Sequence, residues 1–152
     1  MFTVRIQSGD FDAAAEAARL TQGRTDIGAV VTFAGLCRDD DAAGGAPLVA
    51  LTLEHYPGMA EEEITRLVGE ARARWPLLGA TVIHRYGRIV PGDNIVLVVT
   101  ASPHRGAAFA AAEFLMDWLK TRAPFWKLEE REDTNDWVAA KDSDDEAAGR
   151  WE

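Results

Sequence analysis

Basic side chains are concentrated in one stretch of this sequence, between Ser102 and Lys127. The stretch contains His104, Arg105, Lys120, Arg122 and Lys127. Its four lysines and arginines face two carboxylates, Glu113 and Asp117, so its formal charge is +4 − 2 = +2 in a protein whose net charge is −9. A local excess of cations in an acidic protein favours the binding of a small anion. The stretch therefore predicts an anion-binding site.

The beginning of this stretch has the residues of a helix start. Ser102 is a good N-cap, and Pro103 fits the first helical turn, where its missing N–H costs nothing. A helix that begins here places free backbone N–H groups and the positive end of its dipole beside His104 and Arg105. This end could hold a phosphate or a carboxylate, but an ordinary capped helix with two solvated side chains explains the pattern equally well.

The far end of the stretch carries two lysines. Lys120 falls in the last turn of the predicted helix, where a cation also simply complements the dipole. It shares a helix face with Met116, and the residues A-P-F-W-K follow at once. A lysine beside apolar groups and other cations can serve as a general acid, a general base or a nucleophile. Lys127 lies beyond Pro124, off the helix, and could fold back toward Lys120.

The length of the predicted helix separates its two ends. His104 and Lys120 are 120 − 104 = 16 residues apart, which is about 24 Å along a helix at ~1.5 Å per residue. One small ligand can hardly reach both ends within a single subunit. If both ends are functional, we expect a site that is shared across a dimer, or an extended ligand.

Three further residue types could do chemistry. Arg38 follows a predicted buried strand, and its fork of donors could reach a phosphate, although an exposed loop arginine is the simpler interpretation. Cys37 has no partner histidine and no C-x-x-C spacing, so we expect a packed residue and not a nucleophile. His55, His84 and His104 lack metal-ligand spacing, and the sequence has no phosphate-loop motif. We therefore expect no metal site.

Length and composition limit the class of protein. A chain of 152 residues with 47% hydrophobic and 27% charged residues is typical of one globular domain, here 1–152. No apolar run approaches the ~20 residues that span a bilayer, and the N-terminus does not resemble a signal peptide. The lone cysteine suits a reducing cytoplasm. The acidic balance argues against non-specific binding to nucleic acid, and no membrane partner is expected.

Apolar periodicity predicts the elements that position these residues. Strands are predicted over 2–7, 27–36, 47–56, 80–89, 95–101 and, as a charged edge strand, 128–133. Helices are predicted over 11–20 with Asp10 as the N-cap, from the turn at Pro57–Gly58 to about Arg74, from Ser102 onward, and from Asp142 or Ser143 to Trp151. Several strands are joined by turns that are too short for crossovers. The prediction is therefore an α+β fold with a mixed or antiparallel sheet and flanking helices.

Two segments have an unusual composition. The loop 39–46 is acidic and rich in glycine and alanine, and we expect it to be flexible. The tail 129–152 is strongly acidic, but it contains Trp137 and Trp151. These two aromatic residues suggest that the tail docks on the body of the protein or on a second subunit.

Several of these segments together resemble one protein family. The segments are V-V-T-F-A-G-L-C-R, L-T-L-E-H-Y-P-G-M, V-I-H-R-Y-G, H-R-G-A-A-F and F-L-M-D-W-L-K-T-R-A-P-F-W-K. They are similar to segments of the large, catalytic subunits of molybdopterin synthase, and the resemblance runs from about Ile27 to Trp151. Its most specific part is L-K-T-R-A-P-F-W-K.

The resemblance implies an α/β-hammerhead-like fold and a sulfurtransferase of molybdenum cofactor biosynthesis. It implies a homodimer that binds two small ubiquitin-like sulfur carriers and so forms a heterotetramer. The C-terminal thiocarboxylate of the carrier would supply two sulfurs to cyclic pyranopterin monophosphate, which yields the dithiolene of molybdopterin. No further cofactor is expected, because the partner brings the sulfur.

Residue by residue, the resemblance implies that Lys120 is the catalytic lysine and that Lys127 is its partner in substrate binding and proton transfer. It further implies that the phosphate and pterin are held by Arg38, His104 and Arg105. The same site would be lined by Leu36, Cys37, Leu128 and Glu129. A wall of the pocket, or a contribution from the dimer mate, is implied for Phe33, Met116, Trp126 and Lys141. Leu36, Cys37 and Lys141 are not the residues that the family usually has at these positions.

Two other functions remain open at this point. A non-catalytic scaffold for a ubiquitin-like carrier would keep a groove for the carrier's tail but would not need both lysines. A general phosphate-ester enzyme is disfavoured, because the sequence shows neither a metal site nor a phosphate loop. The presence of Lys120 together with Lys127 favours the sulfurtransferase.

Overall fold

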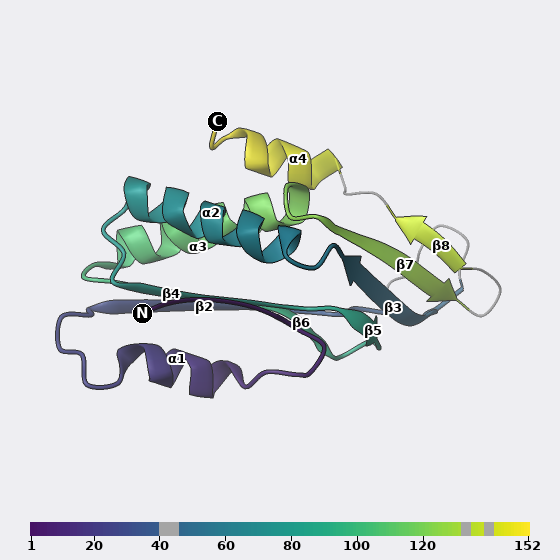
Figure 1. The fold of residues 1–152 in the computed structure, drawn as a ribbon, viewed down its shortest axis with the longest axis horizontal. Helices are drawn as coiled ribbons and strands as arrows, with labels where there is room; N and C mark the ends of the chain where they lie inside the picture. Colours follow the sequence, from purple (N-terminus) through teal and green to yellow (C-terminus); the bar gives the residue numbers. More distant parts are fainter. Residues whose placement is uncertain (40–45, 132–134, 139–141) are drawn as a thin grey trace.

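The computed structural model describes residues 1–39, 46–131, 135–138 and 142–152 (Figure 1). Most of the predicted flexible loop and Lys141 lie outside these residues. The elements are β1 (Phe2–Gln7), α1 (Ala13–Thr21), β2 (Ala29–Leu36), β3 (Leu48–His55), α2 (Met59–Arg74), β4 (Gly79–Arg85), β5 (Gly87–Ile89), β6 (Asn94–Ser102), α3 (Arg105–Thr121), β7 (Phe125–Arg131), β8 (Asn135–Val138) and α4 (Asp142–Gly149). The predicted α+β class is confirmed.

The first sheet is a central layer with helices on both sides. Its strand order is β1-β4-β6-β2, with β1 and β4 parallel and the other pairs antiparallel. Helix α1 covers one face, and α2 and α3 cover the other (Figure 1). The middle of β6 is a continuous apolar run because both of its faces are buried there: Val96 and Val98 pack on the α2–α3 side, and Leu97 and Val99 pack on the α1 side.

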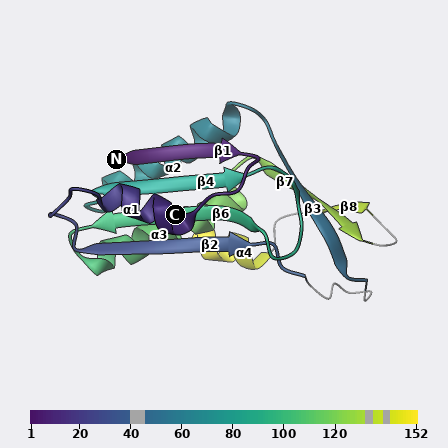
Figure 2. The same ribbon diagram turned by 90° about the horizontal axis from the view of Figure 1, so that it is seen from below.

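The second sheet extends beyond one end of the first sheet (Figure 2). Its strand order is β5-β3-β7-β8, and all of its pairs are antiparallel. Leu48, Leu51 and Leu53 of β3 pack with Ile89 and Cys37 in a small apolar cluster of their own. The junction between the two sheets is the part of the fold that forms the candidate site.

The predicted strand over 80–89 is wrong as a single element. Its first part is β4 in the first sheet, and its last part is β5 in the second sheet. Gly87, the first residue of β5, has a φ of +93°, a backbone conformation that side chains disfavour. This glycine allows the chain to leave one sheet and enter the other. Apolar periodicity continues through the break and therefore does not reveal it.

Two predicted helix starts are also corrected. The N-cap of α1 is Asp12 and not Asp10, because the Asp12 carboxylate accepts a hydrogen bond from the Ala15 N–H at 3.0 Å. Ser102 does not cap α3, because it is the last residue of β6 and pairs with Ala29 of β2. Its hydroxyl donates to the backbone carbonyl of His104, which is the N-cap residue. The pairing of β6 therefore delays the helix until Arg105.

The predicted edge strand over 128–133 begins earlier and lies inside its sheet. Strand β7 starts at Phe125 and pairs with β3 on one side and β8 on the other. Strand β8 corrects a further prediction, because the sequence analysis places its residues in the acidic tail without a strand. The tail then returns to the body through α4, and Arg150 bridges Glu113 and Asp117 at 2.6 and 2.9 Å. None of the helices in the described ranges is long and apolar enough to cross a membrane.

Candidate active site

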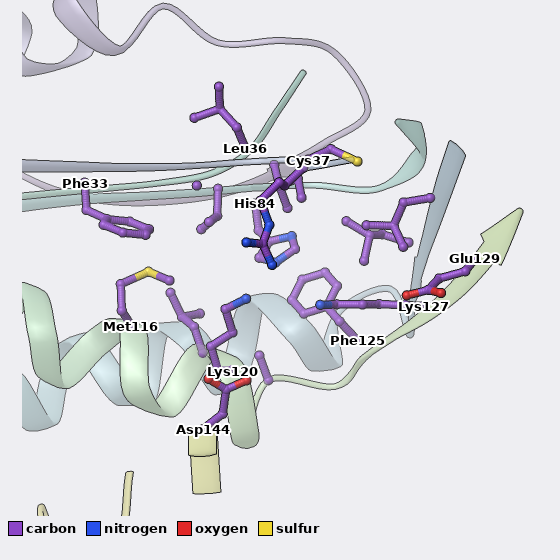
Figure 3. Close-up of a pocket in the computed structure, with 18 of the residues that line it drawn as sticks. Phe33, Leu36, Cys37, His84, Met116, Lys120, Phe125, Lys127, Glu129 and Asp144 are labelled. Carbon is purple, nitrogen blue, oxygen red and sulfur yellow. The ribbon is translucent and has the colours of Figure 1, made fainter. Parts of the chain in front are cut away.

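A cavity of about 320 Å³ lies where the two sheets meet, beside the last turns of α3 (Figure 3). Its walls come from the end of β2, from β3, β4, β6 and β7, and from α3 and α4. Apolar side chains such as Phe33, Leu53 and Met116 form much of the lining. The charged groups that line it are Arg38, Lys120, Lys127, Glu129 and Asp144.

A tight turn after α3 brings the two lysines together. The helix ends at the C-cap Arg122, whose N–H donates to the Trp118 carbonyl at 2.7 Å. The Phe125 N–H then donates to the Ala123 carbonyl at 2.8 Å, which closes a short turn around Pro124. The chain reverses into β7, so Lys120 on the helix and Lys127 on the strand reach the same cavity.

Alternation along β7 decides which of its residues reach the cavity. Phe125, Lys127 and Glu129 line it, as expected for side chains two residues apart on a strand. Trp126 and Leu128 are not among the lining residues, and Trp126 packs against Tyr56 with ring centroids 4.8 Å apart. The prediction that Trp126 and Leu128 share the cavity is therefore not met within one chain.

The end of β2 supplies the opposite wall. Cys37 is buried, and its backbone is held by the Asp93 carbonyl and the Gly92 N–H, both at 2.7 Å. This agrees with the expectation of a packed cysteine. Arg38 follows and lines the cavity with an exposed side chain. Phe33 and Leu36 are 40% and 54% exposed on the outer strand of the first sheet, so this wall presents apolar surface to the outside.

His104 and Arg105 do not belong to this cavity. They lie at the start of α3, whereas Lys120 lies at its end. Within one chain the structure therefore brings together Phe33, Leu36, Cys37, Arg38, Met116, Lys120, Lys127 and Glu129 of the predicted set. Lys141 lies outside the described residues.

His84 is a lining residue that the sequence analysis missed. It is buried at the end of β4, and its ring stacks on Phe125 with a centroid distance of 3.8 Å and an interplanar angle of 16°. Its Nδ1 lies 2.8 Å from the Arg85 carbonyl. From the sequence alone, His84 is considered only as a metal ligand. The available signal is a polar residue near the end of a mostly apolar, buried strand.

The surroundings of His84 favour its neutral form. Burial is the largest effect and lowers the pKa of the ring from 6.5 to about 4, and repulsion from Lys120, Lys127 and His55 acts in the same direction. The hydrogen bond to the Arg85 carbonyl opposes this shift. The described residues contain no group of three or more His, Cys, Asp or Glu side chains that could hold a metal ion.

The lowered pKa of His84 predicts how the free energy of unfolding depends on pH. Below pH ~6.5 the unfolded chain takes up a proton that the folded protein binds only near pH 4, so stability falls over this window. The loss approaches about 3 kcal/mol, from ~1.4 kcal/mol per pKa unit. Urea unfolding of the wild type and of His84→Gln between pH 7 and 4 measures it, because other titrating groups largely cancel in the difference. A difference that does not change with pH would contradict the prediction.

The chain is similar to proteins of one family along nearly its whole length. The family model described as "MoaE protein" matches residues 6–122. A molybdopterin synthase catalytic subunit from Mesorhizobium japonicum is 66% identical over 98% of this chain and 92% of its own length. The MoaE protein from Burkholderia ambifaria has a solved structure with a TM-score of 0.83 and 47% identity, covering 99% of this chain and 98% of that one.

A more distant solved structure comes from Helicobacter pylori. It is a complex of subunits 1 and 2 of the molybdopterin-converting factor, with a TM-score of 0.72 and 20% identity. The alignment covers 91% of this chain and 90% of that chain. At this identity the likeness concerns the fold.

Proposed function

Because the chain belongs to the MoaE protein family, we propose that it is the catalytic subunit of a molybdopterin synthase. In this role it transfers two sulfurs to cyclic pyranopterin monophosphate and so forms the dithiolene of molybdopterin. The observation that carries the proposal is the convergence of Lys120 and Lys127, from a helix and a strand, in one cavity of a protein with this family membership.

The chemistry of the cavity suits the two ligands of this reaction. A thiocarboxylate and a phosphate are both anions, and Arg38, Lys120 and Lys127 offer charge-assisted donors to them. Each transfer breaks the carrier's carbon–sulfur bond by hydrolysis, which leaves the carrier with an ordinary carboxylate. On the pterin a carbon–sulfur bond forms and an oxygen leaves, and this oxygen needs a proton. A lysine ammonium group in the cavity can donate that proton. Lys120 is proposed for this step, and Lys127 for binding of the substrate.

The sulfur donor is proposed to be the C-terminal thiocarboxylate of a small ubiquitin-like carrier subunit. The Helicobacter pylori complex of two subunits supports a partner of this kind. The exposed Phe33 and Leu36 beside the cavity support it further, because a partner would cover this apolar surface. No resident cofactor is required, since the carrier brings the sulfur, and the reaction is proposed to occur in the cytoplasm.

His104 and Arg105 are proposed to complete the site of a second copy of the chain. They lie at the end of α3 that is remote from Lys120. In a homodimer that binds two carriers, they would hold the substrate phosphate in the cavity of the other subunit. Mixing inactive His104→Ala and Lys120→Ala proteins tests this arrangement. Recovery of activity in mixed dimers is expected, and no recovery would count against a shared site.

Reconstitution of the reaction tests the proposed function directly. The wild-type protein is incubated with thiocarboxylated carrier and cyclic pyranopterin monophosphate, and the dithiolene product is assayed. The matched control is the same carrier with an ordinary C-terminal carboxylate, which should give no product. Stable binding of the carrier without any product, under conditions in which a known relative is active, would instead favour a non-catalytic scaffold.

Cys37→Ala is expected to keep most of the activity. The cysteine lies among Leu48, Leu51 and Ile89 in a small apolar cluster, and the proposed chemistry takes its sulfur from the carrier. We expect a rate within about threefold of the wild type and a loss of roughly 1 kcal/mol of stability for the smaller side chain. Rate and unfolding are measured on the same preparation. A collapse of turnover with the fold intact would show that the thiol takes part.

A further inference from the structure

His84 places a neutral nitrogen in a cavity that is otherwise rich in cations. Strand alternation puts Val82 and His84 on the α2–α3 side of β4, whereas Ile83 packs on the α1 side. Val96, the partner of His84 in the neighbouring strand, also lines the cavity. The imidazole therefore continues the apolar face of the sheet up to the wall of the site.

Two contacts fix the orientation of the ring. The Phe125 ring stacks on one face of the imidazole with ring centroids 3.8 Å apart, and Nδ1 lies 2.8 Å from the Arg85 carbonyl oxygen. A carbonyl oxygen can only accept, so Nδ1 must carry the proton. In a neutral imidazole the other nitrogen, Nε2, then has a free lone pair and is a hydrogen-bond acceptor. The low pKa of about 4 keeps the ring in this form near neutral pH.

The cations that face His84 come from several elements. Lys120 of α3 and Lys127 of β7 both lie near enough to disfavour its protonation, and Lys120 has the larger effect of the two. Arg38 at the end of β2 lines the same cavity, as do the carboxylates of Glu129 and Asp144. In Figure 3 the amine end of Lys120 points from α3 toward His84. The Lys120 amine, a potential donor, thus points toward the ring whose Nε2 is the available acceptor.

A neutral acceptor affects a lysine differently from a carboxylate. A carboxylate partner would orient the ammonium group but would also cancel its charge. An imidazole nitrogen can orient the same N–H bonds and leave the positive charge available for an anionic ligand. A flexible lysine on the last turn of a helix otherwise samples many rotamers, and misplacement of a reacting group by about 1 Å can cost ~100-fold in rate.

We propose that His84 is a positioning residue for Lys120, and that its Nε2 accepts a hydrogen bond from the Lys120 ammonium group and directs that group into the cavity. The hydrogen bond itself does not depend on the reaction. Its catalytic consequence rests on the proposed function, because Lys120 must act on the bound substrate for its orientation to affect the rate.

Nitrogen NMR tests the hydrogen bond without any substrate. Long-range proton–nitrogen spectra of the full-length protein at pH 7 should show His84 with a protonated Nδ1 and a bare Nε2. Lys120→Met should shift the Nε2 signal, and the matched variant Lys127→Met should shift it less. A proton on Nε2, or a signal that responds more to Lys127→Met than to Lys120→Met, would overturn the proposal.

Two substitutions of His84 test the catalytic consequence. Glutamine can place its amide oxygen near the position of Nε2, whereas the shorter asparagine reaches only the level of Nδ1. We expect His84→Asn to lower kcat about 10- to 100-fold with KM for the pterin nearly unchanged, and His84→Gln to recover kcat to within about threefold. The proposal would be overturned if His84→Asn kept the wild-type kcat. It would also be overturned if kcat of both variants fell in proportion to their unfolding midpoints, because that would indicate a purely structural role. A wild type without turnover would instead refute the proposed function and leave the NMR result valid.

Discussion

Replacing Lys120 by alanine is expected to lower the rate of product formation by about 10²- to 10⁴-fold, the range for loss of a positioned acid–base group. The side chain is exposed at the end of α3 and points into the cavity, so its removal should leave the core unchanged. The rate of dithiolene formation is measured with saturating thiocarboxylated carrier. Binding of the carrier, measured by titration, should weaken much less than turnover.

Two matched variants make this result specific. Arg122 lies just after the same last turn, but its guanidinium packs over the Trp118 ring at 4.4 Å and does not line the cavity. Arg122→Ala should therefore keep turnover within about threefold, as expected for a surface change. Lys120→Arg keeps the positive charge but cannot readily give up a proton, and it should remain strongly impaired. A rate for Lys120→Ala above about one tenth of the wild type would contradict the assignment.

Replacing Phe114 by alanine is expected to lower the free energy of unfolding by about 3–5 kcal/mol, the usual cost of emptying a buried aromatic site. Phe114 is fully buried on α3, and its ring meets Trp75 and Trp151 edge-on with centroid distances of 5.5 and 5.8 Å. The Arg74 guanidinium lies 4.8 Å from its ring centroid. This side chain thus connects α2, α3 and the end of the tail.

Urea unfolding at pH 7 measures this loss, with Phe109→Ala as the control. Phe109 lies on the same helix but is 62% exposed, so its removal should change stability by no more than about 0.5 kcal/mol. Phe114→Ala should also loosen α4, because Trp151 at the end of the tail loses a packing partner. Asp144 of α4 lines the cavity, so this loosening would reach the wall of the candidate site. If Phe114→Ala cost no more than Phe109→Ala, the ring would not be the centre of this packing.

The elements with strong local signals could be predicted from the sequence alone. Strand β1 and helix α2 have the predicted bounds to within a residue, because alternation over 2–7 and the spacing of apolar residues over 58–74 report which side of each element is buried. The α+β class followed from the short connections. The predictions fail where the end of an element depends on residues that are distant in the chain. Ser102 remains in β6 and does not cap α3, because it pairs with Ala29 of β2.

Residue types alone predict an anion site in the cationic stretch, whereas contacts between distant elements select which of its residues share one cavity. L-K-T-R-A-P-F-W-K identified Lys120 and Lys127 by residue type, and Pro124 between them predicted the reversal that joins them. The separation of His104 from Lys120 also followed from helix length. The role of His84 did not, because it depends on two sheets that meet beside α3. Periodicity reports the burial of one element, whereas a site forms from long-range contacts between elements that are distant in the chain.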